Sequence, residues 1–161
     1  MSVSARLKEL LDTNNVVYET RTHPLTYTAG QTASASNTSR GEMAKTVIVN
    51  ADGLLRMAVL PADSMLNLHH LQWVTRSENM RLATEDEFKD AFPGCELGAM
   101  PPFGGLFGLP VFCDTRLEYN EFIEFNGGTH TETIRMAFDD FKRLAKPTMV
   151  DLRDHAKNRV A

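Results

Sequence analysis

The stretch Ala44-Lys45-Thr46-Val47-Ile48-Val49 is rich in β-branched residues and is typical of a strand. A second apolar run occupies residues 54–60. Between the two runs, Asn50-Ala51-Asp52-Gly53 ends in an Asp-Gly pair, which favours a tight turn because both residues tolerate positive φ. The two runs are therefore predicted to pair as a β-hairpin. This is the strongest hairpin signal in the chain, and it indicates that a sheet organises the rest of the sequence.

Periodic apolar residues and helix-capping pairs indicate further elements. Thr28 with Gln31, and Thr84 with Glu87, have the spacing of capping boxes, in which the two side chains satisfy free backbone donors at a helix start. The remaining pattern predicts a helix from Val3 to about Asn14, a strand over 16–20, a helix from Thr28 that ends before Gly41, a helix over 66–74, a helix from Thr84 that Pro93-Gly94 terminates, a hairpin of 121–126 and 131–136 around Gly127-Gly128, and a last helix with Phe138, Phe141, Leu144 and Ala145 on its apolar side, closed by Pro147.

The order of these elements determines the predicted fold class. Two hairpins interrupt any regular alternation of strand and helix, so a mixed sheet packed by helices is expected rather than a doubly wound one. We predict a single α/β domain of the mixed α+β type over residues 1–147, with a mixed, partly barrel-like β-sheet. A charged C-terminal tail follows over residues 148–161, and a helix, an arm and a disordered segment all remain open for it.

Composition limits the class of protein. The chain has 161 residues, 42% of them hydrophobic, which is enough to bury one core without disulfides or metals. A formal net charge of −4 argues against a protein that coats long nucleic acid, although a local nucleotide contact stays open. No signal peptide or membrane span is recognisable, so a cytoplasmic protein is expected. Cys95 and Cys113 have no Cys or His at ligand spacing, so reduced thiols and no metal are expected.

One segment, residues 98–110, is unusually rich in glycine and proline. It holds four of the ten glycines and three of the seven prolines, so it is neither a helix nor an interior strand. Glycines let the backbone approach a ligand and prolines stiffen a loop, which suits a cradle that offers main-chain amides to a carbonyl or an oxyanion. An ordinary tight crossover explains the same composition equally well. A phosphate loop is excluded because no Lys-Ser or Lys-Thr pair follows.

Few side chains stand out as chemical groups. Lys45 begins an otherwise apolar strand, where a lysine either reaches out to solvent or serves a site. His23 and His130 fall in predicted loops and are open to either an acid–base or a structural role. His69 and His70 are adjacent on a helix and point in different directions, which argues against a metal site. The chain shows no serine nucleophile elbow, and no pairing of a cysteine with a histidine can be inferred.

Several motifs, taken in order, resemble the YbaK-type family, also called the prolyl-tRNA synthetase associated or editing domain. The matching motifs are His23-Pro24 with Thr28 before a helix, Ala44-Lys45-Thr46-Val47-Ile48-Val49 leading to Ala58-Val59-Leu60-Pro61-Ala62-Asp63, Glu96-Leu97-Gly98-Ala99-Met100-Pro101-Pro102-Phe103-Gly104, and Phe125-Asn126-Gly127-Gly128 followed by Thr133-Ile134-Arg135-Met136. The resemblance covers about residues 3–146, and its specificity lies in the order and spacing of the motifs.

The resemblance implies a freestanding aminoacyl-tRNA deacylase that takes part in translation fidelity by hydrolysing the ester of a mischarged amino acid. By the same resemblance, Lys45 and Gly98 are the catalytic residues, and the loop from Gly98 to Pro102 places amides on the substrate carbonyl. The expected substrate-binding residues are Tyr27, Thr28, Thr46, Ala99, Met100, Pro101, Pro102, Asn126, Gly127, Gly128 and His130. The tRNA acceptor end is the expected partner, and an aminoacyl-tRNA synthetase is a candidate second one. No cofactor, metal, membrane or DNA is expected.

The amino acid that is edited stays open at this stage. The cysteine-editing branch of the family carries an aspartate near the position of Thr133, and the alanine-editing branch has asparagine where this chain has Thr46. Because Met100 narrows the expected pocket, small amino acids such as alanine, serine, cysteine or threonine are predicted substrates. The alternative is a non-catalytic module that binds aminoacyl-tRNA or a nucleotide. A generic esterase is disfavoured because no serine or cysteine nucleophile motif is present.

Overall fold

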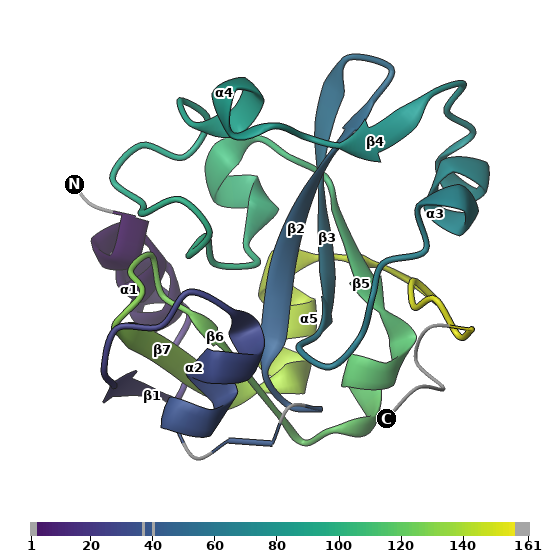
Figure 1. The fold of residues 1–161 in the computed structure, drawn as a ribbon. Coiled ribbons are helices and arrows are strands. Elements are labelled where there is room, and N and C mark those ends of the chain that lie inside the picture. The colour runs from purple at the N-terminus through teal and green to yellow at the C-terminus, as the bar shows by residue number, and fades with distance from the viewer. Residues whose placement is uncertain (1–2, 37, 40, 157–161) are drawn as a thin grey trace.

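The chain folds around two β-sheets with helices packed on both sides, as the computed structural model in Figure 1 shows for residues 3–36, 38–39 and 41–156. One sheet has three strands in the order β1-β7-β6 and the other has five in the order β4-β2-β3-β5-β8. The strands are β1 (Tyr18–Thr22), β2 (Ala44–Ala51), β3 (Leu54–Pro61), β4 (Met80–Leu82), β5 (Val111–Asp114), β6 (Phe122–Asn126), β7 (Glu132–Ala137) and β8 (Thr148–Val150). The α-helices are α1 (Val3–Thr13), α2 (Ala29–Ala35), α3 (Leu68–Thr75), α4 (Glu85–Phe88) and α5 (Phe138–Ala145), and two 3₁₀ helices are η1 (Gly104–Phe107) and η2 (Thr115–Tyr119).

The predicted β2–β3 hairpin forms the centre of the five-stranded sheet. It pairs in antiparallel register from Ala44 opposite Pro61 to Ala51 opposite Leu54. Asp52 and Gly53 both have positive φ, of 52° and 87°, which is the two-residue turn that an Asp-Gly pair favours. β5 and β8 then add on in parallel, whereas β4 adds in antiparallel orientation on the other side. The sheet is therefore mixed, as the sequence predicted.

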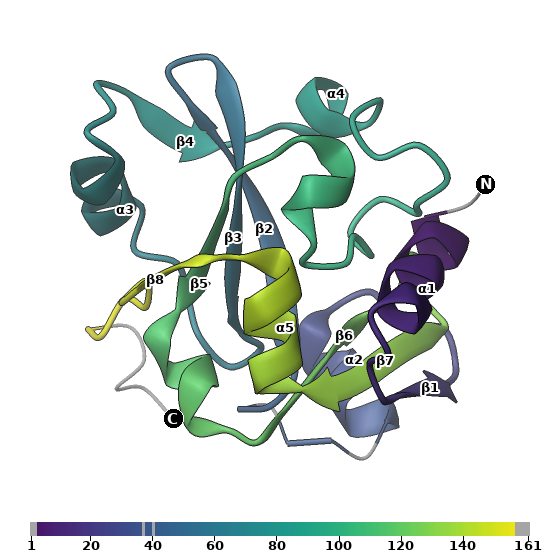
Figure 2. The ribbon, with the colours of Figure 1, turned by 180° about the vertical axis from the view of Figure 1, so that it is seen from behind.

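Alternating side chains of the hairpin enter two separate cores, because successive residues of a strand point to opposite faces. On one face, Ile48, Met57 and Val59 join the main core with α5, which Figure 2 shows lying against the reverse side of the molecule. On the other face, Val49, Ala58 and Leu60 pack against Leu71 of α3 and against Leu152. Burial on both faces fixes the register of the hairpin and so fixes where each of its residues lies.

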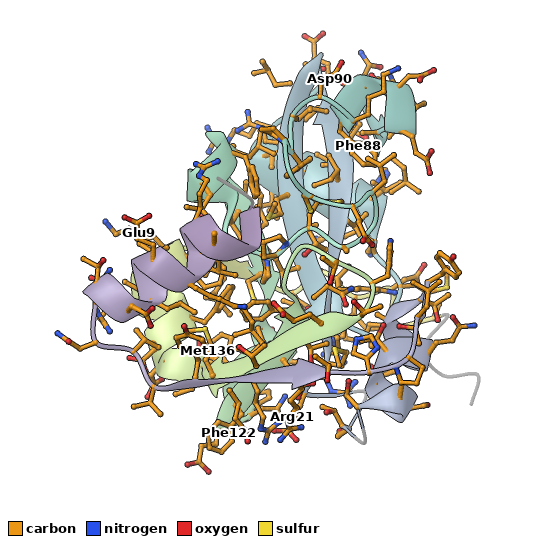
Figure 3. The ribbon with its side chains drawn as sticks, turned by 90° about the vertical axis from the view of Figure 1, so that its left-hand side faces the viewer. Glu9, Arg21, Phe88, Asp90, Phe122 and Met136 are labelled. Atoms are coloured by element: carbon orange, nitrogen blue, oxygen red, sulfur yellow. The ribbon has the colours of Figure 1, made fainter. Side chains whose placement is uncertain are left out.

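The three-stranded sheet is covered by α1, which crosses above β7 in Figure 3, with the buried Met136 on the covered face. The two sheets meet where Met43, just before β2, forms a parallel bridge to Glu124 of β6. The fully buried carboxylate of Glu124 accepts hydrogen bonds from Arg21 at 3.1 Å and from Thr133 at 2.7 Å. These charge-assisted bonds satisfy a carboxylate that would otherwise be costly to bury, and they tie the three strands of this sheet together.

Several sequence predictions need correction. The sheets are separate and are not closed into a barrel. The start of the expected tail is neither a helix, nor an arm, nor disordered, because Thr148–Val150 forms strand β8 against β5 and Leu152 is fully buried. Strand β1 begins two residues later than predicted. Helix α4 ends at Phe88, well before Pro93, and the short strands β4 and β5 were not predicted.

Both capping boxes, the two hairpins, the first helix and the last helix are confirmed. Both cysteines are free thiols, as expected. Among the helices that the structure describes, none has the length and apolar character that crossing a bilayer requires.

Candidate active site

A cleft of about 510 Å³ lies between the first half of β2, the start of α2 and the glycine-proline loop, close to the seam between the sheets. Its lining combines one cation with hydroxyl, amide and small apolar groups. The residues that line it are Tyr27, Thr28, Ala29, Gly30, Gln31, Ala44, Lys45, Thr46, Ala62, Gly98, Met100 and Asn126. Five separate segments of the sequence thus form one site, and Lys45 and Gly98 are both in it.

The cleft exists because part of the edge of β2 is uncovered. At one end β2 meets β6 through Met43, and at the other end β4 pairs only with Val49–Ala51, next to a bond from Ala83 N to Ile48 O. Between these neighbours the edge is open. In an antiparallel ladder, alternate residues of a strand direct their N–H and C=O groups toward the partner strand. Ala62 N donates to Met43 O, so Met43 and Lys45 face β3. The N–H and C=O groups of Thr46 therefore face the opening.

The ammonium of Lys45 is available to a ligand. The side chain is half-buried, and within the described part of the chain it makes no hydrogen bond or ion pair. Burial lowers the pKa of Lys45 from its ordinary value, and the nearby Asp63 carboxylate opposes this shift. Asp63 itself pairs with Arg116 at 3.4 Å. The cleft therefore presents a partly desolvated positive charge whose nearest carboxylate already has another partner.

The loop beside Lys45 holds its backbone in a conformation that requires glycine. Gly98 has a φ of +85°, and a Cβ added there would lie 3.4 Å from Cε1 of His130. The Gly98 N–H donates to the thioether sulfur of Met100 at 3.2 Å, and sulfur is a weak acceptor. By contrast, the Ala99 N–H is bonded to the Glu96 carbonyl at 3.0 Å. The Gly98 amide is therefore the donor that an incoming oxygen could most readily capture.

The β6–β7 connection holds this loop from behind. Glu96 N donates to Gly128 O at 2.8 Å, and Gly128 N donates to Ala99 O at 3.0 Å. His130 is nearly buried, and its Nε2 lies 2.7 Å from the carbonyl of Leu97. These reciprocal bonds preorganise the loop, so the Gly98 amide does not have to be ordered when a substrate binds.

The predicted site residues fall into two groups. Those that line the cleft are Tyr27, Thr28, Lys45, Thr46, Gly98, Met100 and Asn126; those that lie outside its lining are Ala99, Pro101, Pro102, Gly127, Gly128 and His130. Ala99, Pro101 and Pro102 are buried residues of the loop itself, and the others belong to the β6–β7 connection that supports it.

Sequence reasoning missed Ala29, Gly30, Gln31, Ala44 and Ala62 as parts of the lining. Two signals could have found them. Gln31 belongs to the capping box of Thr28, so the first turn of α2 travels with Thr28. Ala44 and Ala62 lie at the open end of the predicted hairpin, next to Lys45 in register.

Asn126 brings an unsatisfied polar group to the cleft. Its carboxamide oxygen is enclosed and has no hydrogen-bond partner within the described chain. Such a group is costly unless a ligand or water completes it, so an orphan in the wall of a cleft points to a binding role.

Nucleophilic and metal chemistry find no support in the cleft. Neither cysteine lines it; burial raises the pKa of the Cys95 thiol to about 12 and raises that of Cys113 as well. Within the described ranges, no group of three or more His, Cys, Asp or Glu side chains is placed to hold a metal ion. The groups present can bind an anion, donate to a carbonyl and orient a water.

A larger hollow of about 610 Å³ lies beside α3, next to the exposed Trp73. Its lining comes from α3 and the turn after it, and no residue of the glycine-proline loop contributes to it. We therefore assign the chemistry to the smaller cleft, where a cation and a weakly bonded backbone donor converge.

Comparison with known proteins identifies the family of the chain. A sequence model of the aminoacyl-tRNA editing domain matches residues 23–144, which contain every residue of the cleft lining. The chain belongs to this family. As an editing domain, the protein is an aminoacyl-tRNA deacylase, and the expected YbaK-type resemblance is confirmed.

One curated relative, from Escherichia coli strain K12, is described as a multifunctional Ser/Thr-tRNA deacylase, ProXp-y. It is 28% identical over 153 residues, covering 92% of this chain and 91% of the relative. A solved structure described as a proposed trans-editing enzyme for prolyl-tRNA synthetase has a TM-score of 0.81 at 21% identity, over 96% of this chain and 98% of that one. A proposed signal transduction protein from Marinobacter aquaeolei has a TM-score of 0.74 at 21% identity, over 97% of this chain and 32% of that longer one. The editing-domain fold is thus shared with both structures.

Proposed function

We propose that the protein removes serine or threonine, and other small amino acids of similar size, from tRNA by hydrolysing the ester to the terminal ribose. The observation that carries this proposal is the convergence of the Lys45 ammonium and the Gly98 amide on one cleft whose lining contains no serine or cysteine. The choice of serine and threonine is supported by the name of the curated relative and by the small lining residues Ala44, Thr46 and Ala62.

The reaction is an attack of water on the ester carbonyl. The carbonyl oxygen displaces the Met100 thioether from the Gly98 N–H, which then stabilises the negative charge that develops on that oxygen. Water forms the new C–O bond, the bond to the ribose oxygen breaks, and a proton passes to that oxygen, giving a free amino acid and a tRNA with a free hydroxyl. Lys45 binds the terminal phosphate or ribose, or stabilises the same charge. With no general base apparent in the lining, a ribose hydroxyl or a second water assists proton removal.

Selection by size follows from the shape of the cleft. Met100 is almost fully buried and also belongs to the main core, so its thioether can release the Gly98 N–H but its side chain cannot leave the wall of the cleft without disturbing the packing. A tight apolar wall rejects each additional methylene by about 1–3 kcal/mol, while it discriminates poorly among smaller side chains. Several small amino acids should therefore be accepted, and proline, leucine and phenylalanine should be rejected.

The partner is the acceptor end of a tRNA. A net charge of −4 does not favour a long phosphate-binding surface, so one to three phosphate contacts are expected. A synthetase that makes such errors is the candidate protein partner, in line with the prolyl-tRNA synthetase named for one structural relative. Aminoacyl-tRNA is consumed in translation, and on that ground we propose a cytoplasmic location for the enzyme.

A deacylation panel tests the proposal. Purified protein is mixed with tRNAs charged with serine, threonine, alanine or cysteine, and with tRNAs charged with proline, leucine or phenylalanine, and the ester remaining is followed in time. Turnover of the small esters alone is the expected result. Preference for a bulky ester would overturn the size argument, and binding without turnover would identify a carrier rather than a hydrolase.

A further inference from the structure

Tyr27 is an exposed aromatic residue at the rim of the cleft. It precedes the N-cap of α2, and it is 71% exposed although it also lines the site. A large aromatic ring left open to solvent beside a ligand cleft offers a flat apolar surface to something that is not part of the chain.

The ring of Tyr27 is held in position from below. It packs against the imidazole of His130, with ring centroids 5.3 Å apart and planes tilted by 50°. His130 is in turn held at three points. Its backbone N–H donates to Glu96 Oε2 at 2.9 Å, and its backbone carbonyl accepts from Thr26 N. Its ring Nε2 lies 2.7 Å from the carbonyl oxygen of Leu97. The Tyr27 N–H also donates to the side chain of Gln31. The ring therefore has a packing partner, and the Tyr27 backbone a hydrogen-bond partner, before any ligand arrives.

The same histidine supports both the ring and the catalytic loop. The imidazole of His130 contacts the Tyr27 ring. Its Cε1 atom also lies 3.4 Å from the point that a Cβ would occupy if one were added at Gly98. The aromatic ring and the Gly98 backbone thus share one nearly buried neighbour, and a ligand of nucleotide size can reach both.

We infer, building on the proposed function, that Tyr27 is the stacking platform for the terminal base of the acceptor end. A ribose carries its base on C1′ and the amino acid on C2′ or C3′. With the ester carbonyl at Gly98, we place the base at the rim, where Tyr27 lies. A base–aromatic stack accepts any base and needs no hydrogen-bond readout, which suits a rim residue with an open face.

Charge in the cleft agrees with this placement. The ribose of the same nucleotide lies between its base and the ester and carries the phosphate on C5′, and Lys45 is the cation of the lining. The negative charge of Asp63 is shared with Arg116, so it does not fully neutralise the positive charge of Lys45. Tyr27, Lys45 and Gly98 together would contact the base, the phosphate or ribose, and the amino acid of one nucleotide.

The test compares two acceptor-stem RNAs that carry the same serine ester, one complete and one whose 3′-terminal nucleotide lacks its base. Wild-type protein should hydrolyse the base-free RNA about tenfold less efficiently, since stacking of one base is worth roughly that factor or more. Tyr27→Ala should lose about tenfold in kcat/KM on the complete RNA, mainly through KM, and should no longer distinguish the two RNAs. Tyr27→Phe keeps the ring and should stay within about twofold of wild type.

Tyr119 provides the matched control. It is 86% exposed, and it lies in η2, outside the cleft lining. Tyr119→Ala should leave both rates unchanged. Equal wild-type rates on the two RNAs would refute the platform while leaving the deacylase intact, whereas an inactive wild-type protein on the complete RNA would refute the proposed function itself. A loss shared by Tyr27→Phe would assign the effect to the hydroxyl and contradict stacking.

Discussion

Replacing Gly98 by alanine tests whether this residue is needed only for the stability of the loop or also for the rate of hydrolysis. At φ +85° an alanine is strained by about 1–2 kcal/mol, part of which is offset because alanine also restricts the unfolded chain. The new Cβ would meet Cε1 of His130 at 3.4 Å, an ordinary contact that adds little. The expected net loss is therefore about 1 kcal/mol, which in a domain of this size lowers Tm by roughly 3 °C.

Activity should fall much further than stability. If the backbone relaxes toward negative φ, the Gly98 N–H leaves its direction into the cleft, and a displacement of about 1 Å at such a donor costs on the order of 10²-fold in rate. The assay is single-turnover hydrolysis of seryl-tRNA, paired with thermal unfolding of the same preparation.

Gly53 is the matched control for this substitution. Its φ is +87°, almost the same as that of Gly98, but it lies at the tip of the β2–β3 turn and an added Cβ would have no neighbour within 4 Å. Gly53→Ala should lose a similar amount of stability and keep its full rate. If Gly98→Ala also keeps its rate, its amide does not stabilise the transition state and the proposed chemistry is wrong.

Four further predictions concern single side chains. Lys45→Ala should fold and lose about 10²-fold in rate; a folded variant with the wild-type rate would contradict its role. Met100→Ala should admit leucyl-tRNA, because the apolar wall recedes; an unchanged substrate panel would show that Met100 does not limit size. Alkylation of Cys95 should be slow near neutral pH and should rise steadily with pH, since burial raises the pKa of this thiol to about 12 and keeps the thiolate scarce below it; rapid inactivation that substrate prevents would place the thiol in the cleft. Leu152→Ala should lower the free energy of unfolding by about 2–5 kcal/mol in a urea titration, and no measurable change would mean that this segment is not part of the core.

The sequence predicted best what is decided locally. The Asp52-Gly53 turn and the Thr28 and Thr84 capping boxes each depend on residues within a few positions of one another, and all three are present. Strands β5 and β8 have three or four residues and depend on pairing across the chain, so no local periodicity reveals them. For this reason residues 148–161 were predicted to be a charged tail, although β8 begins there.

The site was predicted in part for the same reason. Lys45 and the Gly98 loop stand out within their own segments, as a charge in an apolar strand and a dense run of glycine and proline, but the pattern left a structural reading of each open and the family resemblance assigned them to a site. That they share a cleft follows from the uncovered edge of β2, which depends on where β4 stops pairing. His130 illustrates the limit: nothing in its neighbours in sequence indicates that it lies between Tyr27 and Gly98.

The position of the cleft at the seam has a thermodynamic consequence. Lys45 belongs to the five-stranded sheet and Asn126 to the three-stranded one, while the strands themselves are bridged between sheets at Met43 and Glu124. A bound acceptor end would therefore act as a removable cross-link, and by mass action it would stabilise the junction in proportion to the logarithm of its concentration. Amide hydrogen exchange should slow on both sides of the seam when a non-hydrolysable substrate analogue is added, so that the two sheets open together instead of separately. The enzyme would be most rigid while it holds a mischarged tRNA and loosest after releasing it.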